Sequence, residues 1–332
     1  MNVMLLTVLL ASLGPWGNRA QVEVVVVDDT TGKPLPGLGV TGSFEMEVKP
    51  VWQNTGDHNL VKATTDEEGR CRMSGVTDRG KVWCFVRPVP KEYYGWNGTE
   101  FVFKDRTLLG GWEPTDLVST IRLDRVEHPV PLQVNEVPPR FRGNLAELPG
   151  AKCGYDLVEG EWMPPIGYGK VADLEIVCLP REQLGMGRNG RGDQAKAYRD
   201  TVAIRFPGEG NGIVEMHPRP GAGILIRTAP ESGYEPEYRC WLERGLDLQW
   251  RTSTNRQRCF CFRIRTRKDE NGQVIDAKYG KIYRDFYIST GKDRCICGAG
   301  FLYYLNPKSM DRNLEWNFDR DEIPRGSSIN LP

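Results

Sequence analysis

The sequence predicts an all-β protein made of two β-sandwich domains, and three observations support this class. Its 332 residues are enough for two domains of ordinary size. Its 37 glycines and 23 prolines separate short β-prone runs. No apolar pattern of helical period continues beyond a few turns. These features favour short strands joined by turns.

The first twenty residues, MNVMLLTVLLASLGPWGNRA, have the shape of a signal peptide. The apolar run Val3 to Leu13 ends at the helix breakers Gly14 and Pro15, and Ala20 precedes a β-prone segment. We therefore predict that residues 1–20 are cleaved near Ala20 and that the protein is exported, either secreted or periplasmic. Because no Lys or Arg precedes the run, a buried strand or helix is the alternative. The run is shorter than the roughly 20 residues of a membrane helix, so we expect no membrane span.

Residues 21–125 predict the first sandwich. The stretch VEVVVVDDTTGKPLPGLGVTG reads as a strand, a turn over Asp28 to Gly32 and a new start at Leu35. Further short β-prone runs follow, with turn signals in TTDEEGRC and VTDRGKVW. Their spacing is typical of a sandwich.

Two motifs in this part resemble the carboxypeptidase regulatory-like, or transthyretin-like, domain. They are D-x-x-T-G-x-P-L-x-G from Asp28 to Gly37 and T-D-x-x-G-x-C-x-M from Thr65 to Met73. The resemblance implies an Ig-like antiparallel sandwich of about seven strands. It also implies an accessory module attached to exported proteins, and no catalytic role.

The proline-rich residues 126–150 predict a linker, because repeated prolines remove backbone donors and hold a chain extended. Residues 151–320 predict the second sandwich, and 321–332 a C-terminal tail. Strands are expected near 171–179, 201–206, 223–228, 258–268, 279–289 and 295–305, with a hairpin turn in KDENGQ where Asn271 and Gly272 tolerate positive φ.

The second half resembles a group of uncharacterised exported bacterial proteins in which the same accessory domain precedes a β-rich half. The stretches that carry this likeness are GYDLVEGEWMPPIGYGKVADLEI, FPGEGNGI, RTAPESGYEPEY, FRIRTRKDENGQVIDAKYGKIYRDF and FLYYLNPKSMDRNLEW. The resemblance implies an architecture and no chemistry.

Nine cysteines raise the question of disulfides and metals. Cys71 and Cys84, on what read as neighbouring strands, are the candidate disulfide, and two small buried side chains are the alternative. The repeated Cys-x-Cys spacing in RCFCFRIR and RCICGAG could in principle bind zinc. However, strand alternation places Phe260, Phe262 and Ile264 on the face opposite the first cysteine pair, and strand 279–289 would separate the two pairs. We therefore expect free or alternatively paired thiols, no metal and no cofactor.

No catalytic motif is recognisable. The three histidines, His58, His128 and His217, lack the spacing of a catalytic zinc or iron centre. There is no nucleophile elbow, phosphate-binding loop or dinucleotide fingerprint. Paired carboxylates for glycoside hydrolysis cannot be recognised, because the fold sets their separation. Catalytic residues therefore remain unassigned.

Two surface features are candidate binding sites. The segment from Arg251 to Lys268 is basic, and Arg263, Arg265 and Arg267 could bind a polyanion; the alternative is an outer sheet face paired with carboxylates such as Asp285. The aromatic candidates for stacking on a sugar or protein are Tyr93, Tyr94, Trp96 and Trp112, and the alternative is that they cover the end of the sandwich.

These features predict an exported, non-enzymatic protein that binds or scaffolds an envelope or extracellular glycan or protein. The alternative is a carbohydrate-active enzyme or carbohydrate-binding module with its site in the second domain, and a thiol-dependent or metal-binding protein is a third possibility. Basic and acidic residues are equal at 44 each, so no global field would concentrate nucleic acid, and we expect no such partner.

Overall fold

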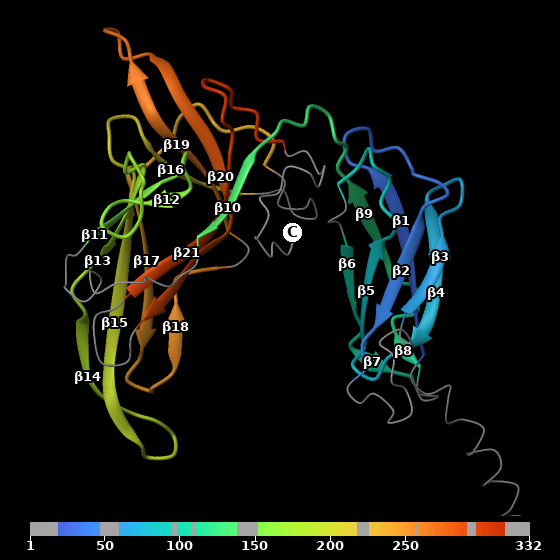
Figure 1. Cartoon of the computed structure of the whole chain (residues 1–332). Helices are drawn as coiled ribbons and strands as arrows, with labels where there is room; N and C mark the ends of the chain where they lie inside the picture. Colours follow the sequence, from blue (N-terminus) through green and yellow to red (C-terminus); the bar gives the residue numbers. More distant parts are fainter. Residues whose placement is uncertain are drawn as a thin grey trace, which may run out of the picture. The chain divides into compact units, whose positions relative to one another are not determined.

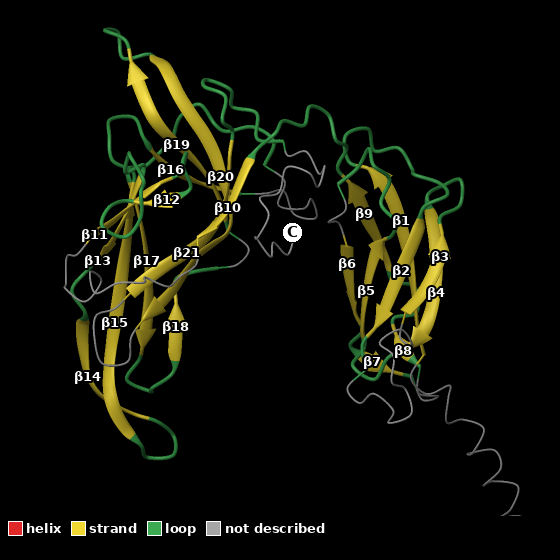
Figure 2. Cartoon of the chain, viewed as in Figure 1, coloured by secondary structure: helices red, strands yellow, loops and turns green. Residues whose placement is uncertain are grey.

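A computed structural model describes residues 19–46, 60–94, 98–107, 111–137, 152–217, 226–255, 258–290 and 297–315. The described residues form strands, turns and loops without a helix (Figures 1 and 2). The predicted all-β class is confirmed. No helix in this part of the chain is long and apolar enough to cross a membrane. The chain divides after Glu127 into two compact units.

The first unit contains two main sheets and a short hairpin. One sheet has the order β4 (Arg70–Val76), β1 (Arg19–Asp28) and β9 (Val118–Leu123). The other has the order β3 (Leu60–Thr64), β2 (Gly39–Phe44), β5 (Lys81–Val86) and β6 (Gly98–Val102). The hairpin pairs β7 (Asp105–Arg106) with β8 (Trp112–Glu113). Because β1 and β9 are parallel, the first sheet is not the fully antiparallel arrangement that the resemblance implies.

Alternation in the strand sequences builds the core of this unit. Val22, Val24 and Val26 of β1 are buried together with Val82 and Cys84 of β5. Every second side chain of a strand points to the same face, so these positions meet between the sheets. Ala20 is also buried in β1, where it is the Cα partner of Gly75. A cut after Ala20 would therefore remove the first two residues of β1.

The second unit has a five-stranded sheet that includes part of the predicted linker. Its order is β10 (Gln133–Val137), β21 (Cys297–Leu305), β20 (Val274–Thr290), β19 (Cys259–Lys268) and β16 (Gly212–Met216). β10 is an antiparallel edge strand beside β21, so the prediction of a linker throughout 126–150 is wrong at this strand. β20 separates β19 from β21, as the sequence predicts.

The other sheet of this unit has seven strands. Its main path is β12 (Glu161–Trp162), β11 (Lys152–Asp156), β13 (Leu174–Cys178), β15 (Gln194–Arg205), β17 (Glu237–Arg244) and β18 (Trp250–Thr252). The seventh strand, β14 (Glu182–Arg188), pairs with the first half of β15. In Figure 1 the β14–β15 hairpin extends beyond the rest of this unit. Of the strand predicted at 223–228, only an isolated bridge at Thr228 is described.

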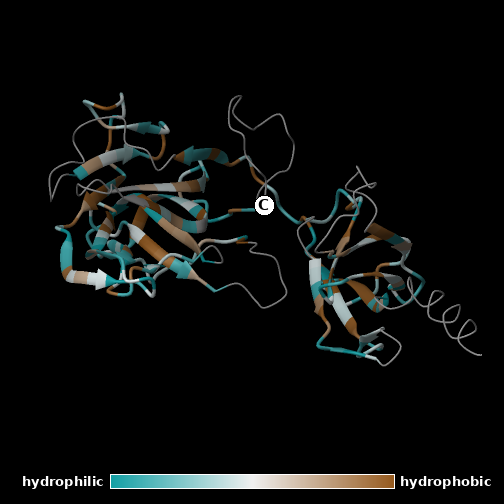
Figure 3. Ribbon diagram, turned by 90° about the horizontal axis from the view of Figure 1, so that it is seen from below, coloured by the Kyte–Doolittle hydropathy of each residue, from teal (hydrophilic) through white to brown (hydrophobic). Residues whose placement is uncertain are grey.

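The first six residues of β19, between β20 and β16 in the five-stranded sheet, are buried on both faces of the sheet. Phe260, Phe262 and Ile264 of β19 belong to the core between the sheets. Cys259 and Cys261 belong to a second cluster, which includes Ile226 and Leu314 from loop segments. The predicted alternation of phenylalanines and cysteines is therefore confirmed, although both sets of side chains are buried. Hydrophobic residues are distributed along the strands in the view of Figure 3.

Candidate functional site

Arg265 interrupts the regular alternation of β19. Its φ is +52°, and the β19–β20 register shifts between Ile264 and Arg267. An extra residue in one strand re-aims the side chains around it. Arg265 consequently reaches two carboxylates of the seven-stranded sheet, and the prediction that it forms one solvated basic face with Arg263 and Arg267 is wrong.

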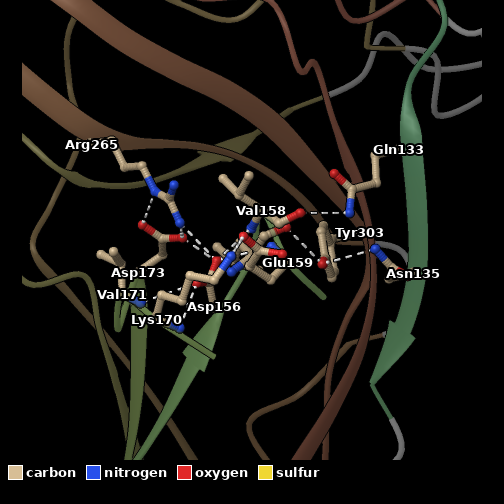
Figure 4. Close-up of polar contacts among 11 residues, drawn as sticks. Gln133, Asn135, Asp156, Val158, Glu159, Lys170, Val171, Asp173, Arg265 and Tyr303 are labelled. Carbon is tan, nitrogen blue, oxygen red and sulfur yellow. Dashed lines mark hydrogen bonds and ion pairs between the residues drawn. The ribbon is translucent and has the colours of Figure 1, made fainter. Parts of the chain in front are cut away.

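The partners of Arg265 are Asp156, at the end of β11, and Asp173, just before β13 (Figure 4). Arg265 Nη2 donates to Asp156 Oδ1 at 2.7 Å and to Asp173 Oδ2 at 3.0 Å, and Nε donates to Asp173 Oδ1 at 3.0 Å. The Asp156 and Asp173 side chains are 0% and 1% exposed. Charge-assisted hydrogen bonds of this kind are the ordinary way in which buried carboxylates are compensated.

Asp156 also organises two loops. Its Oδ1 accepts hydrogen bonds from the amides of Val158 and Glu159 at 3.1 and 3.0 Å. Its Oδ2 accepts from the amides of Lys170 and Val171, both at 3.0 Å. Burial by itself would raise the pKa of Asp156, but these amides and Arg265 outweigh it and lower the pKa. The carboxylate therefore stays ionised inside the fold.

Tyr303 extends the same network to the edge of the five-stranded sheet. Its hydroxyl donates to the carbonyl of Leu157 at 2.8 Å and accepts from Asn135 Nδ2 at 3.0 Å (Figure 4). Gln133 Nε2 donates to the carbonyl of Val158 at 2.8 Å. β10 and β21 are thus tied to the turn that Asp156 holds.

The two carboxylates do not form an open acid–base pair. All four of their oxygens accept hydrogen bonds, since Asp173 Oδ2 also accepts from the amide of Leu157 at 3.1 Å. Burial raises the pKa of Asp173, and Arg265 opposes that rise. A glycosidase needs carboxyl groups that reach a glycosidic bond and a water. Asp156 and Asp173 are instead saturated by the protein, and the arrangement cross-links the two sheets.

The other predicted arginines also have internal partners. Arg263 is 9% exposed, and its Nε donates to the carbonyl of Gly210 at 2.7 Å. Arg267 pairs with Asp276 of β20 at 2.6 Å. Asp285, the suggested partner, lies 3.8 Å from Arg258 instead. The three guanidinium groups therefore do not form one open basic face, and the polyanion patch stays a prediction.

Lys281 of β20 is a buried cation without a carboxylate in hydrogen-bond contact. Its Nζ donates to the carbonyls of Ile226 at 3.1 Å and Leu314 at 2.5 Å, and it lies 5.1 Å from the ring centre of Tyr283 and 5.4 Å from that of Tyr304. Burial lowers the pKa of Lys281 to about 7. This amine holds two loop segments against the outer face of the five-stranded sheet, and its side chain is fully buried.

The predicted Cys71–Cys84 disulfide is not formed. Both side chains are free, buried thiols, and they lie in β4 and β5, which belong to different sheets rather than to neighbouring strands. Burial raises the pKa of Cys71 to about 11 and of Cys84 to about 12, which makes both thiols poor nucleophiles. Cys178 is disulfide-bonded. No metal-binding group of three or more His, Cys, Asp or Glu occurs among the described residues.

The predicted aromatic binding surface is wrong wherever it can be followed. Tyr93, Tyr94 and Trp112 are buried, at 8%, 3% and 8% exposure. Tyr93 donates its hydroxyl proton to Asp28 at 3.0 Å, and Trp112 Nε1 donates to the carbonyl of Thr77 at 2.7 Å. Trp96 lies outside the described residues. The alternative, in which such rings cover the sandwich, explains the three described residues.

The seven-stranded sheet carries an open face that the sequence did not reveal. We call residues 182–199 and 242–252 the arm. Within it, Tyr198 of β15 is the Cα partner of Arg244 of β17, which is the partner of Trp250 of β18. These three side chains lie in one row across the sheet, on the face that continues to the core residue Val202.

Two further rows of side chains share this face. Lys196 is the partner of Met186, and Arg188 is the partner of Gln194. We define the arm face by six residues. They are Met186, Arg188, Lys196, Tyr198, Arg244 and Trp250. Met186 and Trp250 are 63% and 53% exposed, so the core face of the sheet reaches solvent here.

The charges of the arm face are mostly unpaired. Among the described residues, Arg188, Lys196 and Arg244 have no ion-pair partner, and Arg244 Nε is buried without a hydrogen bond. The carboxylate of this face, Asp200, is occupied by Arg181, whose Nε and Nη2 donate to it at 2.6 and 2.8 Å. The opposite face of β15 and β17 is different, because Arg199 there pairs with Glu243 at 2.6 Å.

Comparison with known proteins adds distant structural likenesses. No protein-family model matches the chain, and no curated protein matches it. A shaft pilin from Lactobacillus rhamnosus GG is 16% identical with a TM-score of 0.23, over 32% of this chain and 48% of that one. The minor pilin GBS52 from Streptococcus agalactiae is 18% identical with a TM-score of 0.23, over 37% and 49%. The 3-chlorocatechol 1,2-dioxygenase from Rhodococcus opacus 1CP is 13% identical with a TM-score of 0.26, over 33% and 61%.

The chain therefore spans about half the length of the two pilins it matches. Likenesses this distant carry no argument about function. The carboxypeptidase regulatory-like resemblance stays a prediction, because no family model supports it.

Proposed function

We propose that this chain is an exported, non-enzymatic β protein that binds a ligand outside the cytoplasm through the arm face of its second unit. The proposal depends on a contrast between two sets of cations in the second unit, one paired within the fold and one unpaired. The Arg265 network is closed by contacts within the fold, whereas the arm face presents unpaired cations beside an exposed indole.

Export rests on the signal-like first twenty residues. The enzyme alternative has less support, because the carboxylate pair that the structure brings together is buried and saturated. A binding role needs only a rigid, accessible surface, and the paired strands of the arm provide one.

The test combines location with binding. Intact mass of the chain recovered from its native exported fraction should correspond to a start near Gln21. The purified chain should be retained on members of a glycan and protein panel without altering them, as judged by chromatography of the recovered ligands. Recovery of an uncut chain from the cytoplasm would contradict export. Release of shortened sugars would contradict the non-enzymatic role.

A further inference from the structure

We propose that the arm face recognises an acidic polysaccharide, one whose sugars carry carboxylate or sulfate groups. This inference rests on the proposed binding function and names its ligand class. It depends on three properties of the described face: an exposed ring held in place, an unpaired cation next to that ring with two more in the rows beyond it, and a carboxylate, Asp200, that is already occupied.

The ring is Trp250. Its indole lies edge-on to Tyr198, with ring centres 6.0 Å apart and an interplanar angle of 81°. Tyr198 is itself fixed, because the Arg181 guanidinium carbon lies 3.9 Å from the centre of its ring and Asp200 holds Arg181. Trp250 is therefore an exposed ring on a supported base. Such a ring suits the apolar face of a sugar, since stacking needs area and little reorganisation.

The cation beside the ring is Arg244, which lies between Tyr198 and Trp250 in the cross-strand row. Its Nε is buried and makes no hydrogen bond, and its guanidinium has no ion-pair partner among the residues that the structure describes. A guanidinium fork binds carboxylate or sulfate oxygens in a bidentate manner. A sugar stacked on Trp250 would place a ring substituent next to this fork.

The face extends beyond one sugar. From β18 across β17 to β15 the row spans two strand spacings, about 10 Å. Lys196 and Arg188 lie in the rows beyond it, toward the hairpin tip. A polymer with repeated negative charges can contact all three cations at once. The Asp200 carboxylate does not compete with it, because Arg181 occupies both of its oxygens.

The aromatic content of the arm face favours an acidic polysaccharide over nucleic acid. The face offers one exposed ring, Trp250, rather than the series of rings that successive bases require. Competition with single-stranded DNA tests this distinction.

The experiment is affinity electrophoresis and calorimetric titration of the full chain with polygalacturonate. Fully methyl-esterified polygalacturonate serves as the neutral match, because it keeps the backbone and removes the charge. Dextran sulfate and dextran form a second matched pair. Single-stranded DNA of similar charge is a competitor. The variants are Trp250→Ala and Arg244→Gln.

The matched control variant is Trp83→Ala. Trp83 of β5 is also an exposed tryptophan, at 45%, but Lys81 on the same strand pairs with Glu100 at 3.5 Å. Each variant therefore loses one exposed indole. Only the indole of Trp250 lies beside an unpaired cation.

We expect the chain to bind the acidic polymer of each pair, and to bind its neutral match at least about tenfold more weakly. Trp250→Ala and Arg244→Gln should each weaken binding by about tenfold or more, and Trp83→Ala should not. Added salt should weaken binding of the unaltered chain. Equal binding of charged and neutral polymers would overturn the inference, as would equal loss in Trp83→Ala or preference for DNA.

Failure of the ligand class can be distinguished from failure of the proposed function. If another ligand from the glycan and protein panel binds and Trp250→Ala abolishes that binding, the arm face is a binding site and the acidic polysaccharide is wrong. If Trp250→Ala leaves every detected interaction unchanged, the arm face itself is wrong.

Discussion

Arg265 and Arg244 lie in the same unit and have opposite surroundings. Arg265 reaches two buried carboxylates that also accept backbone amides. Arg244 lies between two rings with no carboxylate beside it. Both are arginines on strands, and the sequence alone does not show that their surroundings differ. The difference teaches that pairing, rather than residue type or local charge density, separates an arginine that holds the fold from one that is free to bind.

The same comparison applies to the predicted basic patch. Seven basic residues between Arg251 and Lys268 suggest a polyanion site. In the fold, Arg263 donates to backbone carbonyls, and Arg265 and Arg267 form ion pairs with carboxylates. The basic residues of this run that the structure describes each have a partner within the fold. The unpaired cations of the arm face instead lie on the β14–β15 hairpin and on β17.

The largest expected change in stability comes from replacing Arg265, the cation held by two buried carboxylates. Arg265→Met leaves Asp156 and Asp173 buried without their guanidinium, so the second unit should lose about 3 to 5 kcal/mol of unfolding free energy. Urea unfolding, with hydrogen exchange in peptides covering 152–178, measures this loss. Arg267→Met is the matched control. Its exposed pair with Asp276 should contribute no more than about 1 kcal/mol. Similar losses in both variants would contradict the assignment of Arg265 as a cross-link.

Lys281 sharpens the comparison, because it is buried without a directly bonded carboxylate. Its pKa is lowered from an ordinary 10.5 to about 7. Between these values the unfolded chain binds one more proton than the folded chain, so this group makes stability rise with pH. The slope should be at most about 1.4 kcal/mol per pH unit and vanish below pH 7.

The measurement is the difference in unfolding free energy between the chain and Lys281→Met from pH 6 to pH 10. Taking the difference cancels the common titration of tyrosines and of most cysteines. A difference that stays constant across this range would show that Lys281 remains protonated in the fold.

A smaller effect is expected where the sequence suggested binding and the structure shows burial. Trp112→Phe removes the hydrogen bond from Nε1 to the Thr77 carbonyl. An unsatisfied buried acceptor costs about 1 to 3 kcal/mol, so the first unit should lose stability in that range. Binding to any ligand of the chain should not change. A change in affinity without loss of stability would restore Trp112 as a binding residue.

The smallest stability change is expected on the arm face. Trp250 is 53% exposed, and its contact with Tyr198 is one edge-on ring pair. Trp250→Ala should therefore alter the unfolding free energy by no more than about 1 kcal/mol. Thermal unfolding of the two chains side by side measures this difference. A loss as large as that of Arg265→Met would mean that Trp250 belongs to the core.

Local sequence patterns predicted the parts of the fold that depend on neighbouring residues. β19, β20 and β21 follow from alternation, and Gly272 has the positive φ, +79°, expected of the hairpin turn. The phenylalanine and cysteine faces of β19 follow for the same reason. These features require only the period of a strand and the turn preferences of glycine.

The candidate sites depend on contacts that the local pattern does not contain. Asp156 is 109 residues from Arg265, and a bulge re-aims the arginine. Trp250, Arg244 and Tyr198 meet through strand register. The burial of the aromatic residues near 93 and 112 does not follow from composition, which does not say which rings the sheets enclose. Register, bulges and burial are properties of the assembled fold.

The most direct test is urea unfolding of the second unit in Arg265→Met, Trp250→Ala and the unaltered chain, each with and without polygalacturonate. A ligand at 100 times its dissociation constant stabilises the state that binds it by about 2.7 kcal/mol. We predict that Arg265→Met is much less stable without ligand, and that Trp250→Ala is nearly as stable as the unaltered chain but gains far less from the polymer. Equal stabilisation of Trp250→Ala and the unaltered chain by the polymer, or no loss of stability in Arg265→Met, would contradict the division between a closed network and an open face.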